Sequence, residues 1–548
     1  MLRSTPLLLP ARSVAVRSLV LALLLAAAVT MAACTQTEPP APTATVPSAE
    51  TFTHLSERVD PWVPRRRVVI LTDIANEPDD QMSLVRLLVS SDQLDIEGLV
   101  ATTSTWMRAR VRPDVINQVL DAYAEVYPTL SQHATGFATA DALRALVTTG
   151  PEGFGMAAIS MQDDAISGGA RRIIDAVDRD DDRPVWVLAW GGNNTLAEAL
   201  ASVRRTRQAA EVEAFVSRIR VYSISDQDDT GPWLRREFPT LHYIGIPSTP
   251  DGDQYYQATW TGISGDRFYK NGDGADFTTF TTNWVERNIR SKGPLGKLYI
   301  LPCCIHEGDT PSFLGLIDNG LASFMSPTYG GWGGRYVWRQ YYGETRPSWT
   351  QGGDAYPGRD NSRDTVIGVD GQPHTSDQAT IWRWRDAFQR DFAARMAWTI
   401  KPVAEANHHP LATVNGHEGQ EPITIDTTVG TAVTLDASAS ADPDGNTIRF
   451  SWFFYPEAGT GIPTQPVAAG PPVQIGGGGS HDEGGIPSAG ADGPPQPPAR
   501  VVLDRETGPR ITATMRTPGT AHVILMVDDN GSPSLTAFRR IILRSPAP

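Results

Sequence analysis

The sequence predicts an α/β domain with a mostly parallel sheet and flanking helices at residues 67–402, followed by an all-β sandwich at residues 403–548. Short apolar segments alternate with amphipathic segments through the first region, which is the pattern of strands and helices in a parallel sheet. In the second region the helical pattern stops, and short strand-like segments separated by turn residues take over. Before residue 67 the sequence has the composition of a targeting segment and a linker.

The strands of the predicted α/β domain lack the strict alternation of a half-exposed sheet, which is typical of parallel sheets covered on both faces. The predicted strands are Val68–Thr72, Ile96–Thr102, Val185–Trp190, Ile219–Ser225, His242–Ile246 and Leu298–Leu301. The predicted helices are Gln81–Val89, Pro113–Val126, Ala140–Val147, Ala170–Val177, Leu196–Val203 and a closing helix at Gln378–Thr399. Ligands of such sheets bind at the carboxyl ends of the strands, so the residues that follow each strand are candidates for a functional site.

The second region has the strand and turn pattern of a small β-sandwich. Two expected strands, Ala432–Ser438 and Phe450–Phe453, lie on either side of a turn. A closing hairpin is expected between His522–Val527 and Ala537–Leu543. Between these pairs, the Gly- and Pro-rich segment Gly476–Pro498 is expected to be a mobile loop.

Residues 1–33 have the features of a secretory signal peptide. Arginines precede an apolar run that ends at Cys34 and is short for a membrane span. The tetrapeptide Met-Ala-Ala-Cys that ends at Cys34 has the form of a lipobox, although an ordinary cleavage site with a chance cysteine is the alternative. Residues 34–66 then form a lipidated N-terminus and a Pro- and Thr-rich linker. We expect an exported lipoprotein, held at a membrane only through its lipid anchor and facing the periplasm or the cell exterior.

Charge and cysteine content exclude some classes of protein. The formal net charge is −15, which argues against nucleic-acid binding because that function needs clustered Lys and Arg. Beyond Cys34 only Cys303 and Cys304 remain. Adjacent cysteines can bridge only with strain, so we expect no disulfide framework and interpret the pair as small buried apolar residues rather than as a redox pair.

An acidic cluster follows the first predicted strand. Asp73 stands at the carboxyl end of that strand, and a Pro-containing turn places Asp79 and Asp80 at the start of the next helix. Helix N-termini favour carboxylates, so capping is one interpretation. Carboxylates this close in sequence also repel one another, and a divalent cation would relieve the repulsion. Oxygen ligands suit Ca²⁺ better than zinc, so the sequence predicts a calcium site.

Longer motifs resemble a known family. The segment Thr72–Leu84 resembles the N-terminal signature of inosine-uridine-type nucleoside hydrolases and, more closely, the nucleoside hydrolase-like domain of cellulose-binding Sde182-type proteins. Further motifs of that family occur in the same order at Glu97–Trp106, Trp190–Leu196, Ser225–Asp229 and Glu307–Phe313. The resemblance covers about Arg67 to Lys401. The sandwich resembles the same family's C-terminal domain and immunoglobulin-like modules of the polycystic-kidney-disease type.

The resemblance implies roles for five residues. Asp73 would be a calcium ligand and the base that activates water, and Asp80 and Asp309 would be further ligands. Asn194 lies in the loop that would donate a backbone carbonyl to the metal. Asp79 would hold sugar hydroxyls.

Other candidate sugar contacts follow later strands. Thr105 falls where the enzymes commonly have an asparagine near the sugar. Asp226 and Gln227 follow a predicted strand, although a solvated acidic loop is an equally good interpretation. Tryptophans near strand ends or Gly-rich turns could stack on sugar rings, but core packing is the better interpretation for any one of them. They are Trp106, Trp190, Trp233 and Trp332.

Departures from the nucleoside hydrolase signature leave the activity open. The acidic turn is longer than usual and has a single aspartate before it, so an alternative alignment puts Ala75 at the base position. His306 lies near the late aspartate, and a general-acid role for it is a guess. We therefore hold two main hypotheses: a secreted calcium-dependent hydrolase of N-glycosidic (nucleoside-like) or related glycosidic bonds, and a non-catalytic protein that binds cellulose or another carbohydrate. A structural surface protein is a third.

Overall fold

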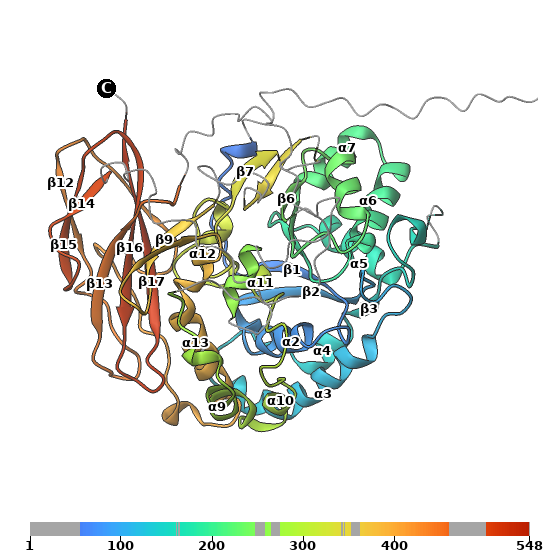
Figure 1. Cartoon of the computed structure of the whole chain (residues 1–548), viewed down its shortest axis with the longest axis horizontal. Helices are drawn as coiled ribbons and strands as arrows, with labels where there is room; N and C mark the ends of the chain where they lie inside the picture. The colour runs from blue at the N-terminus through green and yellow to red at the C-terminus, as the bar shows by residue number, and fades with distance from the viewer. Residues whose placement is uncertain are drawn as a thin grey trace, which may run out of the picture. The chain divides into compact units, whose positions relative to one another are not determined.

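The computed structural model describes residues 55–160, 162, 165–246, 258–264, 274–340, 344, 346–351, 362–459 and 500–546. The first domain is built on an eight-stranded sheet with the order β3-β2-β1-β4-β5-β6-β8-β7 (Figure 1). Neighbouring strands are parallel from β3 to β8, and β7 joins the edge antiparallel, which confirms the predicted mostly parallel sheet. The strands are β1 Arg66–Thr72, β2 Leu94–Ala101, β3 Val147–Thr149, β4 Val185–Ala189, β5 Ile219–Ser223, β6 His242–Gly245, β7 Val337–Gln340 and β8 Pro347–Thr350.

Helices connect most of these strands. They are α2 Asp79–Val89, α3 Pro113–Leu130, α4 Ala140–Arg144, α5 Gly168–Asp178, α6 Asn194–Thr206, α7 Ala209–Ser217, α8 Thr230–Glu237, α9 Thr282–Val285, α10 Gly293–Lys297, α11 Pro311–Leu314, α12 Ala379–Trp382 and α13 Arg385–Trp398. The predicted helices all occur, with shifted ends. The predicted closing helix is divided into α12 and α13 by a turn in which the Trp384 amide donates to the carbonyl of Ile381.

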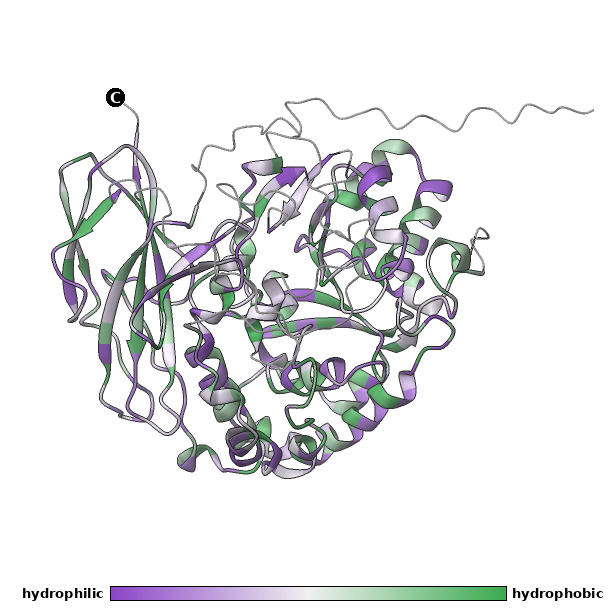
Figure 2. Ribbon diagram, viewed as in Figure 1, coloured by the Kyte–Doolittle hydropathy of each residue, from purple (hydrophilic) through white to green (hydrophobic). Residues whose placement is uncertain are grey.

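Burial on both faces explains why β1 is continuously apolar. Val68 and Ile70 belong to one hydrophobic cluster together with residues of α2 and α3. Val69 and Leu71 belong to a second cluster together with residues of α5 and α6. Alternate residues of a strand point to opposite faces, so α2 and α3 cover one face of the sheet and α5 and α6 cover the other (Figure 1). Hydrophilic residues interleave with hydrophobic ones along the covering helices (Figure 2).

One predicted strand is wrong, and three short strands of this sheet were missed. Leu298–Leu301 forms no strand: Gln81 Nε2 donates to the carbonyl of Leu298 at 2.6 Å, and Arg290 donates to the carbonyl of Tyr299. The place beside β6 is taken by β8, whose Pro and Ser give a weak strand signal. The other missed strands are β3, of only 3 residues, and the antiparallel edge strand β7.

The second domain is the predicted β-sandwich. Its two sheets have the orders β11-β17-β16-β13 and β12-β15-β14. The closing hairpin is confirmed as β16 and β17. The expected strands at 432 and 450 exist as β12 and β13, but they lie in different sheets and pair with other strands. The bounds are β11 Ile423–Asp426, β12 Ala432–Asp436, β13 Arg449–Tyr455, β14 Val501–Leu503, β15 Arg510–Met515, β16 Gly519–Asp528 and β17 Thr536–Ser545.

The sandwich shares apolar contacts with the α/β domain. Tyr455, Ile524 and Phe538 of the sandwich belong to the same hydrophobic cluster as the residues around α2 and α3. The Phe538 amide donates to the carbonyl of Asn319 at 3.0 Å. Gly320 has φ +87°, and a Cβ there would lie 1.8 Å from the carbonyl oxygen of Phe538, so glycine is required at this contact.

Some expectations concern residues outside the described ranges. The signal peptide, the lipidation site Cys34, most of the linker and the Gly- and Pro-rich segment at 476–498 are among them. Within the described residues, none of the helices combines the length and the apolar character needed to span a bilayer.

Candidate metal centre

The start of α2 holds two buried carboxylates at the carboxyl end of β1. The strand ends at Thr72 and the helix begins at Asp79 and Asp80, which are 6% and 3% exposed. The Thr72 hydroxyl donates to the carboxylate of Asp80 and accepts from the amide of Ile74, so the end of the strand orients the second aspartate. The positive end of the helix dipole favours both negative charges.

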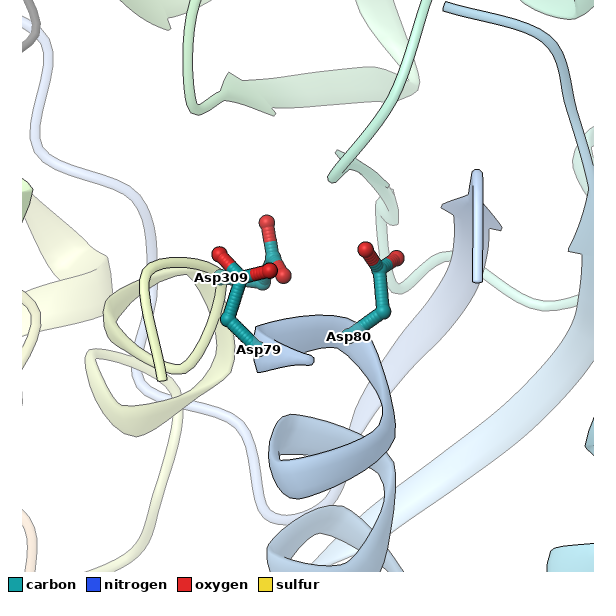
Figure 3. Close-up of side chains that lie close together, drawn as sticks. All are labelled: Asp79, Asp80 and Asp309. Atoms are coloured by element: carbon teal, nitrogen blue, oxygen red, sulfur yellow. The ribbon is translucent and has the colours of Figure 1, made fainter. Parts of the chain in front are cut away.

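A third carboxylate comes from a loop far along the chain. Asp309 precedes α11 and is 3% exposed; its carbonyl accepts from the amide and hydroxyl of Ser312. The loop approaches α2 closely at Gly308, where a Cβ would lie 2.7 Å from Asp79 Oδ2. Figure 3 shows Asp79 and Asp80 at the first turn of α2, with Asp309 brought beside Asp79 from the neighbouring loop.

These three residues fit a hard divalent cation. Each offers an oxygen, and the three oxygens lie within 4.8 Å of one another. Asp79 Oδ1 and Asp309 Oδ2 are buried and have no hydrogen-bond partner in the described part of the chain. Buried carboxylate oxygens are costly unless paired or bound to a metal, so the orphan atoms indicate a missing positive charge. Oxygen ligands of this kind suit Ca²⁺ or Mg²⁺.

The electrostatics of the cluster agree with this assignment. Burial raises the pKa of Asp79, Asp80 and Asp309 well above the ordinary range, and the neighbouring carboxylates raise these pKa values further. Without a cation, the folded protein therefore holds protons in this cluster. A bound divalent cation would displace those protons and let all three groups ionise.

Asp73 lies beside the cluster rather than in the set of three. Its negative charge helps to raise the pKa values of Asp79, Asp80 and Asp309. Burial raises the pKa of Asp73 itself to about 6, opposed by hydrogen bonds from Ser104 and Asn76. The set of three thus includes Asp79, for which the resemblance implied sugar binding. Asp73, for which the resemblance implied metal binding, lies outside this set.

The loop between β4 and α6 packs against the same site. A Cβ at Gly191 would lie 2.9 Å from Asp73 Oδ1, and one at Gly192 would lie 2.5 Å from Asp228 Oδ2, so both positions need glycine. Asn194, the first residue of α6, uses its side-chain amide to donate to the Gly153 carbonyl at 2.9 Å and the Thr103 hydroxyl at 3.1 Å. The expected carbonyl donor therefore stands at the start of α6, directly after the loop whose Gly191 packs against Asp73.

The three expected sugar contacts already have partners. Asp226 forms a two-point ion pair with Arg235 at 2.8 and 2.7 Å. Thr105 accepts hydrogen bonds from Arg108 at its carbonyl and its hydroxyl. Gln227 donates to the carbonyl of Trp190 at 2.6 Å, and its buried Oε1 has no partner among the residues that the structure describes. Of the three, Gln227 keeps an acceptor that a ligand could use.

Sequence reasoning missed a buried ion pair that joins the two elements of the cluster. Arg86 of α2 contacts Glu307 at 2.9 and 3.1 Å, with side chains 2% and 0% exposed. Tyr299 donates to the same carboxylate at 2.8 Å, and the Arg86 guanidinium lies 4.1 Å from the ring centre of Phe392. A lone arginine in the otherwise apolar stretch Leu84–Val89 was the available signal, because a charge on a core-facing position needs a buried partner.

His306 does not fit the guessed role of general acid. It is 1% exposed, and its Nε2 lies 2.9 Å from the hydroxyl of Tyr299. Burial, together with the charge of the nearby Arg86, lowers the pKa of His306 to about 3. The imidazole is therefore neutral at neutral pH, and a general acid must carry a proton to give away.

The adjacent cysteines correct another expectation. Cys303 and Cys304 are bonded to each other as a disulfide, and Cys303 is exposed. The interpretation of both as buried apolar residues is therefore wrong. The reason is local: they lie in the irregular segment between α10 and α11, which is not the buried strand that the sequence predicted.

Comparisons with known proteins match two regions of the chain to one family. Residues 67–336 match the nucleoside hydrolase-like domain of cellulose-binding Sde182, and residues 432–545 match the C-terminal domain of cellulose-binding protein Sde0182. No curated protein matches the chain at a significant level.

One solved structure is similar over nearly the whole chain. It is a nucleoside hydrolase-related hypothetical protein from Saccharophagus degradans that is associated with carbohydrate metabolism. The sequences are 31% identical, the match covers 88% of this chain and 100% of that one, and the TM-score is 0.68. The effector protein XOO4466 matches 64% of this chain and 97% of its own at 11% identity, with a TM-score of 0.27 that is too low to inform the fold.

Proposed function

Because the chain belongs to the cellulose-binding Sde182 family and carries its nucleoside hydrolase-like domain, we propose that it is an exported calcium-dependent hydrolase of N-glycosidic (nucleoside-like) or related glycosidic bonds. The observation that carries the proposal is the buried group Asp79, Asp80 and Asp309, with its orphan oxygens beside Asp73. The carbohydrate-binding name of the family supports a carbohydrate ligand, and cellulose is one candidate.

Asp73 is the residue that we assign to proton transfer. Its pKa of about 6 lies near the working range of a general base at neutral pH. A bound divalent cation would supply the Lewis acidity that makes a water molecule acidic enough to react. Asp73, which lies beside the three carboxylates, would take the proton of such a water. Asp79, Asp80 and Asp309 would hold the cation, and their charges favour the positive charge that develops on a sugar ring during bond cleavage.

A non-catalytic carbohydrate-binding protein is the second candidate, and one observation favours it. Ala75 occupies the base position in the alternative alignment of the acidic motif, and its backbone is left-handed with φ +75°. An apolar methyl group there cannot take a proton. In this reading the acidic cluster binds a cation and sugar hydroxyls, and no bond is broken.

Release of product from a panel of nucleosides and aryl glycosides tests the proposal. The wild-type protein is expected to release base or reducing sugar with added Ca²⁺ and to stop when a chelator is present. Asp73→Asn should lower the turnover number about 10²-fold or more, the usual contribution of a general base, and should keep measurable calcium binding. The exposed Asp141→Asn serves as the control.

Either of two results would overturn the hydrolase proposal. Product release that persists in the Asp73→Asn variant would remove the assigned base. Calcium binding and retention on insoluble cellulose without any product, from any member of the panel, would favour the non-catalytic candidate instead.

Export and lipidation are part of the proposal and have a separate test. The signal-like residues 1–33 and the Met-Ala-Ala-Cys sequence support acylation at Cys34. The full chain expressed in a bacterium is expected to fractionate with membranes and to incorporate labelled palmitate. Cys34→Ser should lose the label and leave the membrane fraction; a variant that keeps both would refute the lipid anchor.

A further inference from the structure

Trp106 differs from the other large aromatic residues of the α/β domain. Its side chain is 54% exposed, whereas Trp190, Trp332 and Trp349 are each 1% exposed. Among the described residues, no other tryptophan is as exposed as this one. A single exposed apolar residue needs no special explanation, so the inference depends on where this ring is held.

The turn that carries Trp106 is ordered and packs beside the acidic site. The hydroxyl of Ser104 accepts from the amides of Trp106 and Met107 at 3.2 and 3.0 Å, and the buried Met107 anchors the turn. A Cβ at Gly191 would lie 2.9 Å from Asp73 Oδ1 and equally close to Thr102 Oγ1, so the start of this turn and the assigned base pack against the same glycine. The exposed ring therefore stands four residues after Thr102, whose side chain packs on the same glycine as the assigned base.

Neighbouring groups complete a polar and aromatic rim. The Arg108 guanidinium lies 4.4 Å from the ring centre of Phe154, which belongs to the loop after β3. That loop is tied to the site because the Gly153 carbonyl accepts from Thr103 Oγ1 and from Asn194 Nδ2, both at 2.9 Å. Trp106, Arg108 and Phe154 thus lie on the segments that follow β2 and β3. Both segments are bonded to Asn194 at the start of α6, directly after the loop whose Gly191 packs against Asp73.

We infer that Trp106 is a stacking platform for a pyranose ring at the rim of the acidic site. A pyranose with mostly equatorial hydroxyls presents an apolar face of C–H groups and a polar edge. The flat indole ring covers the apolar face at little entropic cost, while Arg108 donates to edge hydroxyls. The ligand class is an oligosaccharide of glucose-like units. This inference deepens the proposed function and rests on a carbohydrate being its ligand.

Cellohexaose binding by calorimetry, with and without Ca²⁺, tests the platform on the mature chain. Trp106→Ala is expected to weaken binding about tenfold or more, in line with the loss of a buried aromatic anchor. Trp106→Phe should recover part of the affinity because it keeps a smaller aromatic face. The exposed Phe277→Ala is the matched control, since its side chain is 37% exposed and packs against Arg385, whose guanidinium lies 5.2 Å from its ring centre.

The readouts separate this inference from the proposed hydrolysis. Trp106→Ala should keep the urea midpoint and the calcium affinity of the wild type, because the ring is exposed and is not a metal ligand. Cellohexaose binding that depends on Trp106, without product release, would support the platform while the hydrolase proposal fails. Equal affinity in wild type and Trp106→Ala, or no cellohexaose binding by the wild type, would overturn the inference.

Discussion

Arg86→Met is expected to lower the free energy of unfolding by about 3–5 kcal/mol, the usual cost of leaving a buried charge without its partner. Glu307 is 0% exposed, and burial already raises the pKa of its carboxyl while Arg86 and Tyr299 oppose that shift. Without the guanidinium, the folded protein must bury either an uncompensated carboxylate or a newly acquired proton. Methionine fills a similar volume, so the effect reports on charge rather than on a cavity.

The same ion pair fixes the geometry of the cluster. Arg86 lies on the helix that presents Asp79 and Asp80, and Glu307 lies two residues before Asp309. The backbone of Glu307 is left-handed, with φ +57°, a strained conformation for this residue type that surrounding contacts must maintain. A second link, from Thr310 Oγ1 to Ser83 Oγ at 2.9 Å, joins the same two elements. We therefore expect Arg86→Met to weaken calcium binding as well.

Urea unfolding followed by circular dichroism measures the effect. The double variant Arg86→Met with Glu307→Gln should recover part of the lost stability, because it buries neither charge alone. Arg112→Met is the control, since its ion pair with Asp114 is at the surface and should not contribute measurably. An unchanged urea midpoint for Arg86→Met would contradict this account. So would a double variant whose loss of stability equals the losses of Arg86→Met and Glu307→Gln added together.

Most of the fold could be predicted because its strands are buried on both faces. The five strands that were identified near their observed positions are runs of apolar residues, as in β1, where each residue is buried. The wrong and the missed strands depend on contacts with distant parts of the chain, which the local sequence does not show. The run Leu298–Leu301 is as apolar as a strand, but side chains from α2 and from Arg290 take its carbonyls. Conversely, β8 is held in the sheet by its place beside β6, although its sequence Pro-Ser-Trp-Thr is a poor strand.

In the candidate site, too, local features could be predicted and long-range contacts could not. Asp79 and Asp80 could be identified because strand, turn and helix start are local features, and Asp309 followed from the resemblance. The ion pair that joins their two elements could not be identified, because Arg86 and Glu307 are separated by 221 positions in sequence. Asp226 shows the opposite error, in which a residue is assigned to a site that it does not serve. Its position after β5 suggested a ligand contact, whereas Arg235 on the following helix binds its carboxylate.

Asp309→Asn is expected to stabilise the metal-free protein at neutral pH and to abolish stabilisation by calcium. The pKa of Asp309 is raised well above 3.8 in the folded protein, first by burial and then by Asp79 and Asp80. The folded state therefore keeps protons that the unfolded chain releases, so the stability contributed by these groups falls as pH rises above 3.8. Asparagine removes one of the repelling charges, so the variant should lose less stability between pH 4.5 and 7.5.

With calcium bound, the wild type should become more stable than Asp309→Asn. At about one hundred times its dissociation constant, a ligand of the native state alone adds about 2.7 kcal/mol, and the wild type should gain this while Asp309→Asn gains little. Urea midpoints at both ends of the pH range, in chelator and in Ca²⁺, give the four comparisons, with the exposed Asp141→Asn as the control. If calcium raises the midpoints of wild type and Asp309→Asn equally, the three aspartates do not form the cation site, because removing one of three buried ligands must cost affinity.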